Sequence, residues 1–509
     1  MTKRIFLLLI SASVALSAFT QKTLEELTST YQEALKQWEV PGMAVAIIKN
    51  DSLILSEGFG ISNVETGAKV DDETLFAIAS NTKAFTATAI GLLVEDGKLS
   101  WDDKVVDHLP WFELYAPYVT ANMTVRDLLC HRSGLKTFSG DLLWYGSDYS
   151  RKEIVKRARH LEPAYGFREK FGYSNIMYLA AGLVVEEVSG MSWDVFLQKH
   201  FFNPLQMNRT VTSTLKLEEM DNIAAPHNSP DKGIIAIDYL NWDNVAPAGS
   251  IISNVKDLSK WIKTNLHYGI YGSDTIFSPS TAMEMWKQHT PLPVSSYSKK
   301  LWPSTHLKSY GLGWSMYDYH GEKIVTHNGG YDGMISQTVL VPEKKSGFVI
   351  LTNSLSRMYY PLLYETLDFL LDEEPQYNWS EYFLEQNTKY EERMKQMVAR
   401  QDSLRQKDTK PSLSPEKYAG AYSGDLYGEA QITLKKDGSM NLQMVPSPKF
   451  HSKLTHWHHD TFMIKFEEFP SLPRGWVTFV LDRNGKVHEM KIDVPNPDFD
   501  FTELEFIKQ

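Results

Sequence analysis

The stretch "LFAIASNTKAFTATAIGLL", residues 75–93, places Ser80 three positions before Lys83 at the start of an apolar run. Residues three apart share one face of a helix, so the Lys83 amine can reach the Ser80 hydroxyl. A helix N-terminus favours developing negative charge, and a partly desolvated lysine has a lowered pKa and can act as a base. The alternative is an N-cap serine beside a lysine that reaches water from the edge of the core. The spacing alone does not decide, because Ser253 and Lys256 repeat it.

A second segment, "FGYSNIMYLAAGLVVEEVSG" at residues 171–190, places Tyr173 and Asn175 just before an apolar helical pattern. A phenol beside Lys83 could shuttle the serine proton, and a carboxamide could hold a substrate amide. The alternative is a core tyrosine followed by a capping asparagine. This segment therefore adds weight to a catalytic interpretation of Ser80 without deciding it.

A third segment, "VTHNGGYDG" at residues 325–333, places His327, Asn328, Gly329 and Gly330 at the end of a predicted strand. Glycine at this point lets a ligand approach the strand backbone. The N–H of Gly330 could pair with that of Ser80 as an oxyanion hole. The alternative is an ordinary glycine-rich hairpin.

Helical and strand-like patterns divide the chain into parts. A helix-rich middle lies between β-type runs from the two ends of residues 22–373, which predicts one α+β domain. Residues 374–411 are charged with sparse apolar positions, which indicates an exposed helical linker. Residues 412–509 carry short strand patterns joined by turns, which predicts a small β-barrel.

The order Ser-x-x-Lys, Tyr-x-Asn, His-x-Gly resembles that of the serine β-lactamase and penicillin-binding-protein-like hydrolase superfamily. The branch in question holds class C β-lactamases, D-aminopeptidases, D-Ala-D-Ala carboxypeptidases and esterases. The resemblance covers roughly residues 25–370 and implies an antiparallel sheet flanked by helices plus an all-helical subdomain. The tail from about Ser414 resembles the small, lipocalin-like β-barrel appended to many bacterial members. Flanking stretches that carry the resemblance are "VPGMAVAIIKND", "TVRDLLCHRSGL", "GSIISNVKDLSKW" and "YGLGW".

The resemblance implies roles for the first two segments. Ser80 is the nucleophile that becomes acylated, and Lys83 and Tyr173 act as general base and proton shuttle. Asn175 contacts the substrate or orients Lys83. The implied cycle is acylation followed by hydrolysis, with no metal and no cofactor.

The third segment takes the remaining implied roles. His327 stands where lactamases and penicillin-binding proteins usually carry lysine, and Asn328 and Gly329 lie against the substrate. Backbone N–H groups of Ser80 and Gly330 hold the oxyanion. Because histidine is largely neutral at pH 7, it recruits a substrate carboxylate less well than lysine, which argues against efficient β-lactam hydrolysis.

These observations predict a serine hydrolase that acts on amide or ester bonds, with D-amino-acid-containing peptides as the candidate substrate. Two alternatives stay open: a penicillin-binding-like protein or slow β-lactamase, and a non-catalytic ligand-binding member, including a carrier whose barrel holds an apolar ligand. His456 and His458 would share a strand face, but no third metal ligand is evident nearby. Cys130 follows two leucines and is interpreted as a buried apolar residue.

Composition and the N-terminus bear on localisation and partners. The net charge of −11 and pI near 5.8 argue against nucleic acid as a partner. Residues 1–20 fit a signal peptide, because Lys3 and Arg4 precede an apolar run too short to span a bilayer comfortably. The alternative is an uncleaved membrane anchor. With one cysteine and no possible internal disulfide, a bacterial periplasmic or secreted location is expected, and the oligomeric state is left open.

Overall fold

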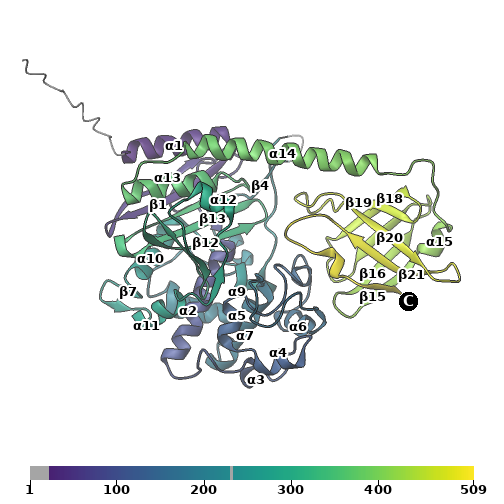
Figure 1. The fold of residues 1–509 in the computed structure, drawn as a ribbon, viewed down its shortest axis with the longest axis horizontal. Coiled ribbons are helices and arrows are strands. Elements are labelled where there is room, and N and C mark those ends of the chain that lie inside the picture. Colours follow the sequence, from purple (N-terminus) through teal and green to yellow (C-terminus); the bar gives the residue numbers. More distant parts are fainter. Residues whose placement is uncertain (1–21, 230–232) are drawn as a thin grey trace, which may run out of the picture.

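The computed structural model describes residues 22–229 and 233–509, so the predicted signal peptide at residues 1–20 lies outside the described residues. An α+β domain is followed by a long helix and a closed all-β barrel (Figure 1). The predicted fold class is confirmed in both parts. Among the described residues, no helix combines the length and apolarity that a bilayer crossing requires.

The centre of the α+β domain is an eight-stranded antiparallel sheet. Its strand order is β2-β1-β14-β13-β12-β11-β10-β9, so β1, from the start of the domain sequence, pairs with β14, the last strand of the sheet in sequence. The two ends of the domain sequence therefore meet in one sheet. The strands are β1 (Gly42–Lys49), β2 (Ser52–Gly60), β9 (Thr290–Leu292), β10 (Lys308–Tyr310), β11 (Ser315–Tyr319), β12 (Glu322–Tyr331), β13 (Met334–Val341) and β14 (Ser346–Thr352).

Both faces of the sheet are covered, which explains the almost continuous apolar sequence of β1. Met43 and Val45 belong to a core with α1 and α13, whereas Ala44 and Ala46 belong to a second, larger core with α2 and α10. Successive strand residues point to opposite faces, so one strand serves both cores. The covering helices are α1 (Leu24–Gln37), α2 (Thr82–Glu95), α10 (Val255–Leu266), α11 (Pro279–Met285), α12 (Ser296–Leu301) and α13 (Tyr359–Leu371).

A helical subdomain packs beside the sheet and is centred on α7, which contacts α2, α5, α6 and α9. Ten of the fifteen residues of α7 are buried, in agreement with its apolar sequence. Its helices are α3 (Val105–His108), α4 (Pro117–Asn122), α5 (Val125–Leu129), α6 (Arg151–Arg157), α7 (Asn175–Ser189), α8 (Trp193–Leu197) and α9 (Ala246–Gly249). Short two-stranded pairs are β3 (Phe76–Ala77) with β6 (Ile252–Ser253), β4 (His227–Asn228) with β5 (Ile235–Ala236), and β7 (Ile270–Tyr271) with β8 (Asp274–Thr275).

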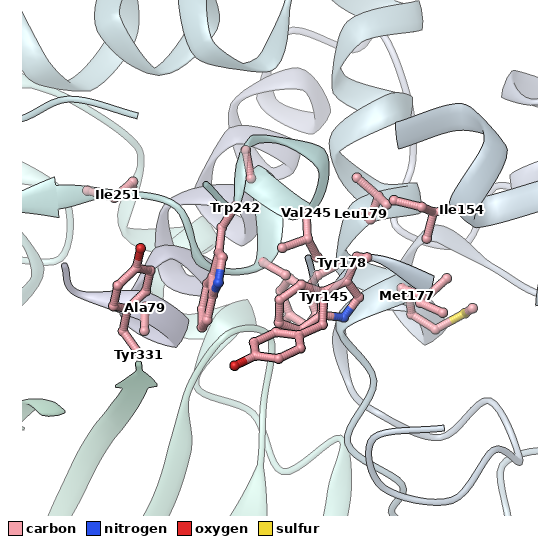
Figure 2. Packing of buried hydrophobic residues seen from close by; sticks show 14 of the residues in the cluster. Ala79, Tyr145, Ile154, Met177, Tyr178, Leu179, Trp242, Val245, Ile251 and Tyr331 are labelled. Atoms are coloured by element: carbon pink, nitrogen blue, oxygen red, sulfur yellow. The ribbon is translucent and has the colours of Figure 1, made fainter. Parts of the chain in front are cut away.

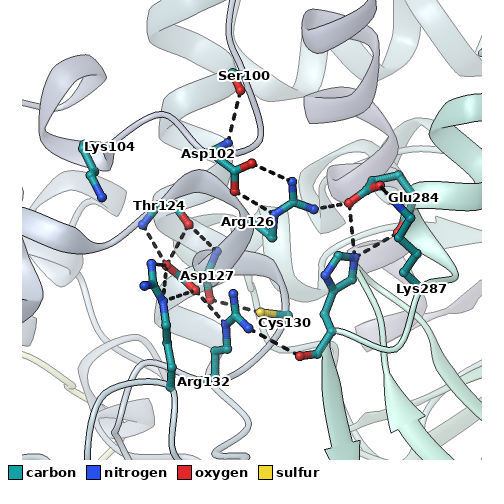
Figure 3. Close-up of polar contacts among 12 residues, drawn as sticks. Ser100, Asp102, Lys104, Thr124, Arg126, Asp127, Cys130, Arg132, Glu284 and Lys287 are labelled. Atoms are coloured by element: carbon teal, nitrogen blue, oxygen red, sulfur yellow. Dashed lines mark hydrogen bonds and ion pairs between the residues drawn. The ribbon is translucent and has the colours of Figure 1, made fainter.

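A buried carboxylate ties the loops of this subdomain together (Figure 3). Asp127, in the first turn of α5, accepts hydrogen bonds from Arg132 Nε at 2.7 Å, Arg168 Nη2 at 2.6 Å and Thr124 Oγ1 at 2.7 Å. Burial alone would raise the pKa of Asp127, but these hydrogen bonds outweigh it and lower the pKa. The two arginines flank the loops that carry His131 and lead toward α7.

The charged linker and the barrel complete the chain. Helix α14 (Trp379–Ser403) lies inside the predicted linker, and Trp379 anchors it to the sheet domain while most of the helix is exposed. In the barrel, the buried rings of Tyr418 and Tyr422 pack against Phe479, and the carrier interpretation stays an untested alternative. The barrel comprises α15 (Pro415–Tyr418), β15 (Gly420–Gly424), β16 (Gly428–Leu434), β17 (Met440–Met444), β18 (His451–His458), β19 (Thr461–Ile464), β20 (Gly475–Leu481), β21 (Val487–Asp493) and β22 (Phe506–Lys508).

Candidate active site

Ser80 lies in a 3₁₀ turn, η1 (Ala79–Asn81), that leads directly into α2. The preceding Ala79 has φ of 45°, in the left-handed region that costs a non-glycine residue about 1–2 kcal/mol. Surrounding bonds hold this conformation, because the Ile78 carbonyl accepts from Asn81 N at 3.1 Å and from Ser336 Oγ at 2.6 Å. The N-cap position of α2 belongs to Asn81, so the N-cap interpretation of Ser80 is wrong.

Lys83 is completely buried, so it does not reach water from the edge of the core. Its Nζ lies 3.0 Å from Ser80 Oγ, 2.7 Å from Asn175 Oδ1 and 2.8 Å from the Ala248 carbonyl oxygen. Burial lowers the pKa of Lys83 to about 7, and the charge of Asp141 opposes the shift. A large fraction of Lys83 is therefore neutral at pH 7.

Asn175 is the first residue of α7, and Ser174 rather than Asn175 caps that helix, by accepting from Met177 N. Asp141 Oδ2 accepts from Asn175 Nδ2 at 2.6 Å, which turns the amide oxygen toward Lys83. Burial raises the pKa of Asp141 to about 7. The capping interpretation of Asn175 is therefore wrong, and its side chain joins Asp141 to the lysine.

Tyr173 lies across the lysine from this amide. Lys83 Nζ is 4.7 Å from the centroid of the Tyr173 ring. Burial raises the pKa of Tyr173 strongly, and a hydrogen bond with Ser80 opposes the shift. The ring is supported by His131, whose centroid lies 4.2 Å away. Burial, and then the nearby Lys83, lower the pKa of His131, so this imidazole is neutral.

His327 is buried, its ring centroid lies 6.3 Å from that of Tyr173, and it is not among the residues that line the cavity at Ser80. Its Nε2 is 3.0 Å from the Tyr310 hydroxyl, and its Nδ1 is 2.6 Å from the Asn328 carbonyl oxygen. Burial and the charge of Lys83 lower the pKa of His327 to about 3. The imidazole is thus neutral and hydrogen-bonded at both ring nitrogens. Of the predicted site residues, Ser80, Tyr173, Asn175, Asn328 and Gly330 line the cavity, whereas Lys83, His327 and Gly329 do not.

The glycines of β12 allow the strand to pass close to the serine turn. A methyl group on Gly329 would lie 2.2 Å from the Ile78 carbonyl oxygen and 2.9 Å from Ser80 N, so no other residue fits there. Asn328 and Gly330 are exposed and line the cavity at Ser80. Ser80 and Gly330 thus line the same cavity, and the oxyanion-hole role of their backbone N–H groups stays a prediction.

These residues meet in a cavity of about 640 Å³. Ser80, Tyr173, Asn175 and Gly330 are among the residues that line it. Aromatic rings form much of the remaining wall, and Figure 2 shows two of them, Tyr331 and Trp242, side by side with centroids 4.5 Å apart. The aromatic residues of the lining are Phe138, Trp144, Tyr145, Tyr173, Trp242, Tyr331, Tyr390 and Phe499.

Two site residues were missed by the sequence reasoning. Asp141 lies in "SGDLLW", at no fixed spacing from any motif, and only folding brings it to Asn175. His131 lies within "TVRDLLCHRSGL", which the resemblance included, but no role was assigned to it. The neighbouring Arg132 is the signal that could have drawn attention to His131. Arg132 binds the buried Asp127 and so fixes the loop that carries the histidine.

The two minor candidates lie elsewhere. Cys130 is free and buried, as predicted, and burial raises its pKa to about 11. His456, His458 and His459 lie at the barrel surface, where His458 and His459 hydrogen-bond to Gln406. No group of three or more metal-ligating side chains gathers within residues 22–229 and 233–509.

Comparisons with known proteins identify the family of the chain. A family model described as "Beta-lactamase" matches residues 27–368, and one described as "Domain of unknown function (DUF3471)" matches residues 404–508. The chain is 29% identical over 443 residues to the unguisins hydrolase ungD' of Aspergillus campestris, covering 82% of this chain and 79% of the relative.

Solved structures share the fold. The octameric penicillin-binding protein homologue from Pyrococcus abyssi superposes with a TM-score of 0.62 at 24% identity, covering 95% of this chain and 99% of that one. The D-amino acid amidase from Ochrobactrum anthropi SV3 gives a TM-score of 0.55 at 22% identity, covering 68% of this chain and 96% of that one. With a family match over more than half of its length, this chain belongs to the β-lactamase family of penicillin-binding-protein-like serine hydrolases.

Proposed function

We propose that this protein hydrolyses amide or ester bonds through an acyl-enzyme on Ser80. The observation that carries the proposal is the set of three contacts at the Lys83 amine. A neutral amine has two hydrogens and one lone pair. The carbonyl oxygens of Asn175 and Ala248 only accept hydrogen bonds, so they take the two hydrogens and leave the lone pair for the Ser80 hydroxyl.

The reaction follows from this arrangement. The proton of Ser80 passes to Lys83 while Oγ attacks the substrate carbonyl carbon. The N–H groups of Ser80 and Gly330 stabilise the oxyanion, and the Tyr173 hydroxyl relays the proton to the leaving nitrogen or oxygen as its bond to carbon breaks. Water then attacks the acyl-enzyme with the same groups acting in reverse. Deacylation releases the acid and restores Ser80.

The substrate class that we propose is a peptide or ester containing D-amino acids. Two similarities support it: the relative from Aspergillus campestris is named a hydrolase of unguisins, and a solved neighbour is named a D-amino acid amidase. We also propose that the protein acts in the bacterial periplasm or outside the cell, on the grounds of the N-terminal sequence pattern and the absence of disulfides.

Intact-protein mass spectrometry after incubation with a fluorophosphonate, and separately with benzylpenicillin, tests the proposal. Wild type, Ser80→Ala and Ser296→Ala are compared. Ser296 lies on the surface of α12 three positions before Lys299, so it repeats the spacing without the buried site.

A fluorophosphonate adduct on wild type and Ser296→Ala, and none on Ser80→Ala, is the expected result. Turnover of D-aminoacyl amides and esters would then identify the substrate. A stable penicilloyl adduct at Ser80 would instead favour a penicillin-binding protein. Correctly folded wild type that forms neither adduct would contradict the proposal.

A further inference from the structure

The barrel of unknown function reaches over the cavity at Ser80. Two of its loops contribute lining residues: the connection between β19 and β20 (residues 471–473) and the segment after β21 (residues 495–499). Helix α14 adds Tyr390 and Met394. The pocket is therefore built from three parts of the chain, and only one of them belongs to the β-lactamase-like domain.

Specific contacts fix the barrel in this place. Glu503, in a 3₁₀ turn before β22, accepts from Ser139 Oγ at 2.6 Å and from Gly140 N at 2.8 Å. Lys136 forms an ion pair with Asp500. These contacts hold the loop that ends in Asp141, the residue that orients the Asn175 amide.

An aromatic cluster continues the junction into the pocket. The centroid of the Tyr145 ring lies 4.3 Å from that of Phe499 and 4.9 Å from that of Phe469, and both phenylalanines are on barrel loops. The Tyr145 hydroxyl donates to Asp332 Oδ1 at 2.6 Å, at the end of β12. Barrel, helical subdomain and central sheet thus meet around one tyrosine.

The charged residues that line the cavity are all acidic. Among the residues that line the cavity, the charged ones are Asp141, Asp332 and Asp498, and none is basic. Asp332 Oδ2 is buried and accepts no hydrogen bond from the described residues. Burial raises the pKa of Asp332 to about 6, with Asp498 adding to the shift and Lys449, in an adjoining cavity, opposing it. Since Oδ1 already accepts from Tyr145, an entering cation would supply the partner that Oδ2 lacks.

We propose that the C-terminal barrel completes the substrate pocket, and that the completed pocket selects an apolar or aromatic group bearing an ammonium and rejects one bearing a carboxylate. Asp332 and the barrel residue Asp498 face the ammonium, and aromatic rings such as Phe499 surround it, since ring faces attract cations. This inference rests on the proposed function, with the ammonium being a free amine of the substrate. A carboxylate in the same place would meet the like-charged groups of Asp332 and Asp498.

The test measures how small ligands slow fluorophosphonate labelling of Ser80 at pH 7. The ligands are 2-phenylethylamine, 2-phenylethanol and phenylacetate, which differ mainly in charge. Asp332→Asn, Asp498→Asn and Phe499→Ala are compared with wild type and with Glu429→Gln, an exposed carboxylate on β16 away from the cavity. Asp498 lies at the solvent-exposed rim, so its variant leaves the fold intact even if Asp332→Asn does not.

In wild type, 2-phenylethylamine should protect at concentrations at least ~10-fold below those of phenylacetate. Asp498→Asn should reduce the ratio of the protecting concentrations of phenylacetate and 2-phenylethylamine by about threefold, because an exposed charge is screened by solvent. Phe499→Ala should weaken protection by all three ligands, and Glu429→Gln should leave every value unchanged.

Equal or better protection by phenylacetate, or an unchanged ratio in both aspartate variants, would overturn the inference while labelling of Ser80 still upholds the proposed function. Complete absence of labelling on folded wild type would overturn the proposed function, and this inference with it.

Discussion

Lys83 and Asp127 are both fully buried, but their surroundings differ in charge. Asp127 binds two arginines and a threonine, so its charge is neutralised and its pKa is lowered. Lys83 has a serine hydroxyl and two neutral carbonyl oxygens around it, so burial dominates and its pKa falls to about 7. The two sites show that a buried ionisable group stabilises loops when it is paired and becomes available for proton transfer when it is not.

The largest expected effect concerns Lys83, the buried group that makes no ion pair with another described residue. Lys83→Met should slow fluorophosphonate labelling of Ser80 by ~10³-fold at pH 7, because the general base is lost. Its folding stability should stay equal or rise, because an apolar side chain of similar volume replaces a poorly solvated amine. Labelling rates and urea denaturation measure the two properties. A variant that keeps more than a tenth of the rate would contradict the role of Lys83.

On the paired side, Asp127→Asn should lower the free energy of unfolding by about 3 kcal/mol, the lower end of the range for a broken buried pair, since both arginines are partly exposed. Asp102→Asn is the matched control, because that exposed partner of Arg126 should contribute less than about 1 kcal/mol. Urea denaturation measures the free energy of unfolding of both variants. Equal losses of unfolding free energy in the two variants would mean that burial does not strengthen the ion pairs of Asp127.

Tyr173→Phe should reduce the labelling rate by ~10²-fold with little change in stability, since it removes the proton relay and keeps the ring on His131. Tyr239→Phe serves as the control, because Tyr239 opens a second Tyr-x-Asn sequence that does not line the cavity. Similar rates for the two variants would remove Tyr173 from the relay.

The pH dependence of stability should separate the two sites further. Between pH 7 and 10 the unfolded chain holds a proton on Lys83 that the folded chain has lost, so the free energy of unfolding should rise by up to ~1.4 kcal/mol per pH unit. Lys83→Met should flatten this rise. Asp127 has a lowered pKa in the folded state, so its contribution is present above pH 4 and disappears as the pH falls further. Urea titrations across both ranges check the two signs.

The smallest effect concerns the link between Asp141 and the lysine. The negative charge of Asp141 raises the pKa of Lys83, so Asp141→Asn should move the midpoint of the pH–rate profile to lower pH by less than ~1 unit. The rate should fall by less than ~10-fold if the new amide still holds Asn175. A shift to higher pH would show that Asp141 acts in another way.

Much of the fold was predictable, because local patterns carry it. The apolar run after Ser80, the alternation in the strands and the turns of the tail each predict their element from neighbouring residues. The grouping of Ser80, Lys83, Tyr173 and Asn175 was predictable from the family resemblance that the order of the three motifs carries. The polar surroundings were not, because Asp141 and Ala248 reach Asn175 and Lys83 only through tertiary packing.

The same limit explains why the positions of His327 and of the barrel loops could not be predicted from the sequence. His327 occupies a motif position, yet it is buried against Tyr310 and is not among the residues that line the cavity. The tail was predictable as a barrel from its strands, but its loops reach the site through contacts more than three hundred residues apart in sequence, such as Lys136 with Asp500. Long-range contacts of this kind leave no periodic signal in the chain.

The central claim is that Lys83 is neutral near pH 7 and takes the proton of Ser80. The most direct measurement is the rate constant of fluorophosphonate labelling of Ser80 from pH 5 to 9, followed by intact-protein mass spectrometry in wild type and Lys83→Met. The account predicts a rate that rises about tenfold per pH unit at low pH and levels off with a midpoint at about 7, and no such rise in the variant. A flat profile in wild type, or the same profile in both proteins, would contradict it.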